Sequence, residues 1–81
     1  MEEITLDAVI EMLEDVKEGV DYRNATALVD NREIDSFDIL GIISAIDDEF
    51  GLSVPAKDIV PANFNSAQSL CALINRLAEE E

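Results

Sequence analysis

Apolar residues recur three or four positions apart in two stretches of the first half of the chain, which is the spacing of one buried helix face. These stretches predict helices over residues 4–18 and 36–50, each with acidic residues on its other sides. Gly19 and Gly51 follow directly, and glycine is the residue that most often ends a helix. The first half of the chain is therefore expected to be two helices and the segment that joins them.

The second half of the chain carries two further helical signals. Residues 65–68 (Asn-Ser-Ala-Gln) fit a capping box and predict a last helix that ends near Ala78. One helical turn is predicted over 56–60, with Pro61 as its stop. Residues 19–35 form a long connection whose scattered apolar residues indicate that it lies across the helices. We therefore expect an all-α fold, a bundle of three main helices plus one short helix, with a long first loop.

The second predicted helix is apolar on two sides. Its broader side, the predicted core face, is made by Ile39, Ile42, Ile43, Ile46 and Phe50. A narrower stripe is made by Phe37, Leu40 and Ser44. A helix in so small a domain buries one side in its own core, which makes the narrower stripe a candidate docking surface. The alternative is that Phe37 and Leu40 pack beneath the long loop.

An aspartate and a serine stand where the second predicted helix begins. Asp35 is in the N-cap position, where its carboxylate accepts from the first free backbone N–H groups. Ser36 then lies in the first turn with its hydroxyl near solvent, and the partial positive charge of that helix end favours an anion. No nearby residue would deprotonate the hydroxyl. Ser36 is therefore suited to carrying a phosphodiester and not to acting alone as a nucleophile.

The charge of the chain narrows the class of partner. Its 81 residues suffice for one domain, over 1–81, and 19 acidic against 5 basic residues give a net charge of −14. Nucleic acids and anionic membranes both require a cationic surface, so neither is an expected partner. The charge favours proteins with basic docking patches. The alternative is that acidity only keeps the protein soluble and monomeric, and a monomer is expected.

Several kinds of chemistry are missing from the sequence. The chain has no histidine and one cysteine, which excludes a Ser-His-Asp triad and makes a zinc site implausible. Cys71 is expected to be a buried, inert thiol. The acid-rich segment 30–38 lacks the ligand order of a calcium loop, although a small calcium-responsive protein stays an alternative. We expect a protein that is not an enzyme, has no metal site and, without a secretory signal or membrane span, is cytoplasmic.

Taken together, these residues resemble the acyl carrier protein family. Asp35-Ser36-Phe37 is similar to the Asp-Ser-Leu motif of that family, and residues 39–50, which end in Asp-Asp-Glu-Phe, resemble its second helix. The Val-Pro pair at 54–55, the short third helix and the opening of the last helix match as well. The resemblance extends over essentially the whole chain, including its length, its acidity and the long first loop.

The resemblance implies that a separate phosphopantetheinyl transferase esterifies Ser36 with 4′-phosphopantetheine from coenzyme A, with Asp35 in the recognition motif of the transferase. The thiol of this arm would hold acyl intermediates as thioesters and deliver them to enzymes of fatty-acid, polyketide or related biosynthesis. Family members dock to enzymes through the second helix, and the matching positions are Phe37, Asp38, Leu40, Ser44, Asp47 and Asp48. In many members the acyl chain lies between the helices, and the matching positions are Ile42, Ile46, Phe50, Val54 and Ile59.

Two residues depart from the family pattern. Phe37 replaces the usual leucine after the serine, and Gly41 stands where many fatty-acid carriers have a glutamate. Gly41 costs the helix about 1 kcal/mol relative to alanine, and it either allows close approach of a partner or is simply tolerated. These departures leave open a specialised carrier for a polyketide, an amino acid or a D-alanyl group. A module that binds a protein through the second helix, with Ser36 unmodified, is the alternative from another class.

Overall fold

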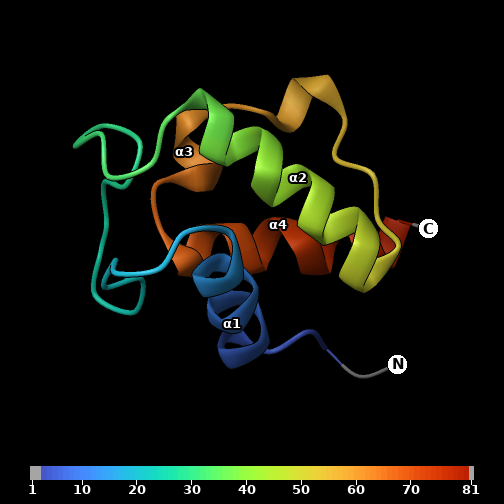
Figure 1. Cartoon of the computed structure of the whole chain (residues 1–81). Helices are drawn as coiled ribbons and strands as arrows, with labels where there is room; N and C mark the ends of the chain where they lie inside the picture. Colours follow the sequence, from blue (N-terminus) through green and yellow to red (C-terminus); the bar gives the residue numbers. More distant parts are fainter. Residues whose placement is uncertain (1–2, 81) are drawn as a thin grey trace.

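The computed structural model describes residues 3–80, which contain helices, turns and loops but no strands. The three longer helices are α1 (Leu6–Val16), α2 (Ser36–Phe50) and α4 (Ala67–Glu80). Between α2 and α4 lie the 3₁₀-helix η1 (Ala56–Asp58) and the short helix α3 (Pro61–Phe64) (Figure 1). The predictions of an all-α fold and of a long connection between the first two helices are confirmed. Within 3–80, no helix combines the length and the apolar character that a bilayer crossing requires.

The core lies where α1 contacts both α2 and α4, and α3 packs against α4 (Figure 1). Its buried helical side chains are Val9, Ile10, Met12 and Leu13 of α1, Ile42 and Ile46 of α2, Phe64 of α3, and Ala67, Leu70, Leu73, Ile74 and Leu77 of α4. Of the predicted core face of α2, the remaining three residues are only half-buried, namely Ile39, Ile43 and Phe50. The helical spacing therefore identified the inward side of α2 correctly but made it broader than it is.

The first two helices begin and end close to the predicted positions. Thr5 caps α1, because its hydroxyl accepts from the Ala8 N–H over 3.1 Å. Lys17 ends α1, because its backbone is extended (φ −151°, ψ 110°) while its N–H still donates to the Leu13 carbonyl over 2.8 Å. The helix is thus shorter than the predicted 4–18. Gly51 ends α2 as predicted, in the left-handed conformation (φ 67°) that glycine adopts at little cost.

The long loop between α1 and α2 packs against the helices, as its scattered apolar residues predicted. Its buried side chains are Tyr22, Leu28 and Ile34. Asn65, just before α4, anchors the middle of the loop: its Oδ1 accepts from the N–H groups of Val29 (3.0 Å) and Asp30 (3.2 Å). The Asn65 carbonyl also accepts from the Leu28 N–H over 2.8 Å. The loop is thus tied to the start of α4, far away in the sequence.

The short helix lies later in the chain than predicted. Pro61 begins α3 and does not stop a helix at 56–60, because proline fits the first helical position, where its missing N–H has no intrahelical acceptor. Residues Ala56–Asp58 form η1 instead. An ion pair between Asp58 Oδ1 and Arg76 Nη2 (2.6 Å) joins η1 to α4. The sequence predicted a helical turn at this place but not the ion pair.

The start of α4 agrees with the prediction in its cap and differs in its capping box. Of the two expected caps, Asn65 and Ser66, it is Ser66 whose hydroxyl accepts from the Ser69 N–H, over 3.0 Å. Gln68 does not complete a capping box; its Nε2 donates to the Arg23 carbonyl of the long loop over 2.9 Å. The helix continues to Glu80, past the predicted end at Ala78.

Candidate functional site

The candidate site is the N-terminus of α2, where Asp35 and Asp38, on either side of Ser36 in the sequence, form a reciprocal capping box. Asp35 has an extended backbone (φ −115°, ψ −173°), and its Oδ1 accepts from the Asp38 N–H over 3.0 Å. Asp38 Oδ2 accepts in return from the Asp35 N–H over 3.0 Å. The predicted N-cap role of Asp35 is confirmed. Asp38 adds a second hydrogen bond across the same turn.

Ser36 is the first residue of α2 and is exposed to solvent. The capping box uses the N–H groups of Asp35 and Asp38, so the N–H groups of Ser36 and Phe37 are those left without an intrahelical acceptor. These two groups and the dipole of a 15-residue helix favour negative charge at this position. The turn can therefore accommodate an anionic group esterified to the Ser36 hydroxyl.

Lys17, the residue that follows α1, reaches the same capping box. Its Nζ donates to Asp38 Oδ2 over 3.1 Å. The hydrogen bond from the Asp35 backbone and, to a smaller degree, the Lys17 ammonium lower the pKa of Asp38 below its ordinary value. Asp38 is therefore an anion at neutral pH, and part of its charge is compensated inside the molecule.

The narrower stripe of α2 faces solvent together with two acidic residues of the next turn. We call this surface the docking face; it consists of Phe37, Leu40, Ser44, Asp47 and Asp48, all exposed. Phe37 is 82% exposed and Leu40 is 63% exposed, so the interpretation that they pack beneath the long loop is wrong. Asp38, predicted alongside them, is half-buried and turned toward Lys17.

Gly41 lies where α2 packs against the end of α1. A Cβ atom at this position would lie 3.2 Å from Cγ1 of Val16, which is tighter than an ordinary van der Waals contact. Val16 is the last residue of α1. Packing against Val16 therefore favours a small residue here, beside the two explanations from the sequence, close approach of a partner and simple tolerance.

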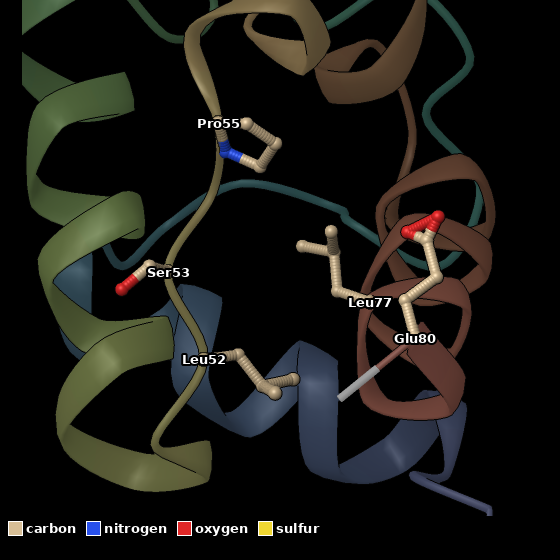
Figure 2. A pocket seen from close by; sticks show the side chains of 5 residues that line it. All are labelled: Leu52, Ser53, Pro55, Leu77 and Glu80. Carbon is tan, nitrogen blue, oxygen red and sulfur yellow. The ribbon is translucent and has the colours of Figure 1, made fainter.

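The five residues predicted to line an acyl-chain pocket lie at different depths. Ile42 and Ile46 are buried, Phe50 and Val54 are half-buried, and Ile59 is 40% exposed. A cleft of about 220 Å³ opens nearby, between the connector that follows α2 and the end of α4, with Leu77 pointing toward the connector (Figure 2). Its lining residues are Leu52, Ser53, Pro55, Leu77 and Glu80. The predicted pocket stays a prediction.

A second cleft, of about 430 Å³, lies between α1 and the end of α2 and is acidic. Its lining residues are Ala8, Glu11, Glu14, Asp15, Glu49 and Phe50. Within residues 3–80, no group of three or more histidine, cysteine or carboxylate side chains is arranged to hold a metal ion. The acids around this cleft are exposed and form a solvated surface.

Cys71 is less buried than predicted. It is half-buried, with its thiol within 3.5 Å of the Ile4 carbonyl and of Asn75 Nδ2. Burial raises the pKa of the Cys71 thiol, which disfavours the reactive thiolate. These surroundings agree with a structural thiol.

One residue beside the site was not predicted from the sequence. Lys17 follows the apolar residues Ile10 and Leu13 by seven and four positions, so it lies on the same side of the first helix as they do. Its partner Asp38 is 21 positions away. No local signal connects the two residues, since the contact depends on how α1 and α2 pack.

Comparison with protein-family models, curated proteins and solved structures finds no match to this chain.

Proposed function

We propose that this chain is a stand-alone carrier protein with an acyl-carrier-like bundle, and that Ser36 is the attachment point of 4′-phosphopantetheine. The observation that supports this most directly is the exposure of Ser36 at the first position of a capped, 15-residue helix. The exposed apolar side chains of Phe37 and Leu40 lie next to it on the same helix. The helix order and the long first loop agree with the resemblance of the sequence to acyl carrier proteins.

The residues around Ser36 suit the proposed arm. A transferase needs an accessible hydroxyl, and Ser36 is exposed. The phosphodiester bears a negative charge, which the free N–H groups of Ser36 and Phe37 and the helix dipole favour. Once attached, the arm supplies a thiol that holds acyl groups as thioesters. The chain itself positions the arm and presents it to other enzymes.

The docking face supports partners of a defined kind. Phe37 and Leu40 offer apolar area for burial, and Asp47 and Asp48 offer negative charge about two to three turns farther along α2. An apolar centre with charged neighbours fits an enzyme surface on which basic residues surround a shallow apolar depression. We therefore propose the transferase and acyl-processing enzymes with basic patches as the partners.

The direct test is incubation of the purified protein with coenzyme A and a broad-specificity phosphopantetheinyl transferase, followed by intact-mass measurement. The expected result is a mass gain of one phosphopantetheinyl group that is absent from Ser36→Ala. Ser53→Ala, which removes an exposed hydroxyl from the connector after α2, is the matched control and should be modified normally. A wild-type protein that gains no arm, or a Ser36→Ala variant that still gains it, contradicts the proposal.

The cargo follows from a second measurement, the intact mass of the protein purified from its native cell. An added acyl or aminoacyl mass on the arm would distinguish a fatty-acid or polyketide carrier from an aminoacyl or D-alanyl carrier.

The exposed Phe37 and Leu40 also favour a second candidate, a module that binds a protein without any arm. A partner that binds Ser36→Ala as tightly as wild type, with no arm found on the native protein, would support that candidate.

A further inference from the structure

The residues at the C-terminal end of α1 hold the first two turns of α2 in place. Lys17 forms its ion pair with Asp38, and Val16 packs against Gly41, three positions later on α2. Positions three apart lie on the same side of a helix, so Asp38 and Gly41 both face α1. We call this contact the α1–α2 corner; it consists of Val16 and Lys17 against Asp38 and Gly41.

A single oxygen atom connects this corner to the turn that carries Ser36. Asp38 Oδ2 accepts both from Lys17 Nζ (3.1 Å) and from the Asp35 N–H (3.0 Å). The other oxygen of the capping box, Asp35 Oδ1, accepts from the Asp38 N–H. Lys17 therefore restrains the side chain that closes the box, and Ser36 lies between the two members of that box.

Lys17 is itself well restrained. Its N–H donates to the Leu13 carbonyl over 2.8 Å, and its carbonyl accepts from the buried Tyr22 hydroxyl. Its side chain is half-buried, unlike that of a freely solvated surface lysine. These contacts fix the backbone of Lys17, while its side chain stays 40% exposed, so the ion pair itself is worth at most about 1 kcal/mol.

We infer that Lys17 is a positioning residue for the modification of Ser36, acting through Asp38 to keep the first turn of α2 in the geometry that a transferase recognises. The inference rests on the proposed function. In that reaction the Ser36 oxygen forms a bond to the phosphorus of the pantetheinyl phosphate of coenzyme A. The bond from this phosphorus to adenosine 3′,5′-bisphosphate breaks, and the hydroxyl proton passes to a base of the transferase. Lys17 takes no part in these bonds.

The sign of the effect separates positioning from a simple charge effect. Removal of a lysine makes this acidic chain more negative, which alone would strengthen encounter with a basic transferase. Loss of positioning does the opposite, because fewer molecules present Ser36 correctly at any moment. Lys57, an exposed lysine of η1, provides the matched control for charge.

The experiment compares the rate of arm transfer to wild type, Lys17→Ala, Lys17→Arg and Lys57→Ala, at a temperature at which circular dichroism shows every variant folded. We expect kcat/KM to fall about two- to fivefold in Lys17→Ala, mainly through kcat. Lys17→Arg should recover most of the loss, and Lys57→Ala should equal or exceed wild type. In an Asp38→Asn background, Lys17→Ala should have little further effect.

A second readout reports on the turn itself. Amide hydrogen exchange at Asp35 and Asp38 should quicken in Lys17→Ala, while exchange at the buried Ile46 stays as in wild type. Equal transfer rates for Lys17→Ala and wild type, or equal losses in Lys17→Ala and Lys57→Ala, would overturn the inference. Both outcomes require that wild type is modified; a wild type that gains no arm instead contradicts the proposed function.

Discussion

At the scale of single residues, Tyr22 connects the long loop to the corner that supports Ser36. It is buried, and its hydroxyl donates to the carbonyl of Lys17. Burial first, and then the carboxylates of Asp38, Glu14 and Glu33, raise the pKa of Tyr22 from 10.0 to about 12. The neutral phenol is thus the form that the folded protein favours, because the phenolate would lie buried among negative charges.

This shift predicts how stability depends on alkaline pH. The phenol of the unfolded chain ionises near pH 10, so the stabilisation is complete below that pH and is lost as pH rises toward about 12. Tyr22→Phe loses one hydrogen bond, about 1 kcal/mol at neutral pH, but lacks this dependence. The gap in thermal midpoint between the two proteins should therefore narrow above about pH 10. Parallel curves would contradict the prediction, and phenolate absorbance of the single tyrosine reports its ionisation directly.

At the scale of elements, the long loop depends on one side chain outside it. The Asn65 amide oxygen satisfies two N–H groups of the loop, at Val29 and Asp30, and its Nδ2 lies 3.2 Å from Asp30 Oδ2. The Val29 N–H lies in a part-buried site, where a backbone group left without a partner is costly. The loop in turn contributes Tyr22, and therefore part of the support of Lys17. Asn65 thus acts on the site indirectly, through the position of the loop.

Asn65→Ala should lower the free energy of unfolding by about 1–2 kcal/mol, because it leaves the two loop N–H groups without their acceptor. Asn24→Ala is the matched control, since the Asn24 amide bonds only an exposed carboxylate, that of Asp21, over 3.0 Å. Chemical denaturation of both variants measures the difference. Amide exchange should quicken at Val29 and Asp30 in Asn65→Ala alone, and similar stabilities for the two variants would show that the anchor is dispensable.

At the scale of the whole molecule, the net charge of −14 opposes the compact state. Four of the acidic residues gather where α1 and the end of α2 meet, namely Glu11, Glu14, Asp15 and Glu49 around the acidic cleft. Added salt shortens the range of this repulsion to about 10 Å at 0.1 M. The ion pairs that salt also weakens are few among residues 3–80, so the loss from screening them is smaller than the gain.

The fold should therefore be more stable at moderate salt than at low salt. An increase of about 1 kcal/mol in the free energy of unfolding would raise the thermal midpoint by about 4–8 °C in a domain of this size. The variant Glu11→Gln/Glu14→Gln should raise the midpoint at low salt and reduce its dependence on salt, since it removes part of the repulsion. A midpoint that falls as salt is added from low ionic strength would contradict the prediction, as would a variant with unchanged salt dependence.

Local patterns predicted much of this molecule for a physical reason. Helical spacing depends on neighbours three and four positions apart, so the sequence indicated α1, α2 and α4 and the inward side of each. Glycine tolerates the left-handed conformation, which placed the end of α2 at Gly51. Capping is equally local, and Asp35 was identified as the cap before Ser36. The predictions at Pro61 and Gln68 were wrong. Proline can stop one helix or begin another, and Pro61 begins α3. A glutamine near a helix start can complete a capping box or bond elsewhere, and Gln68 bonds the Arg23 carbonyl.

The sequence by itself determined the all-α class, the acidic surface, and the exposed position of Ser36 at the head of a helix. It did not determine which side chains around Ser36 contact one another and which face solvent. Tertiary structure alone decided that Phe37 and Leu40 face solvent, that Gly41 lies against Val16, and that Lys17 reaches Asp38. The contacts of Val16 with Gly41 and of Lys17 with Asp38 join residues far apart in the chain. The exposure of Phe37 and Leu40 depends on which side of α2 the long loop covers. Such contacts follow from the packing of whole helices, which no local pattern encodes.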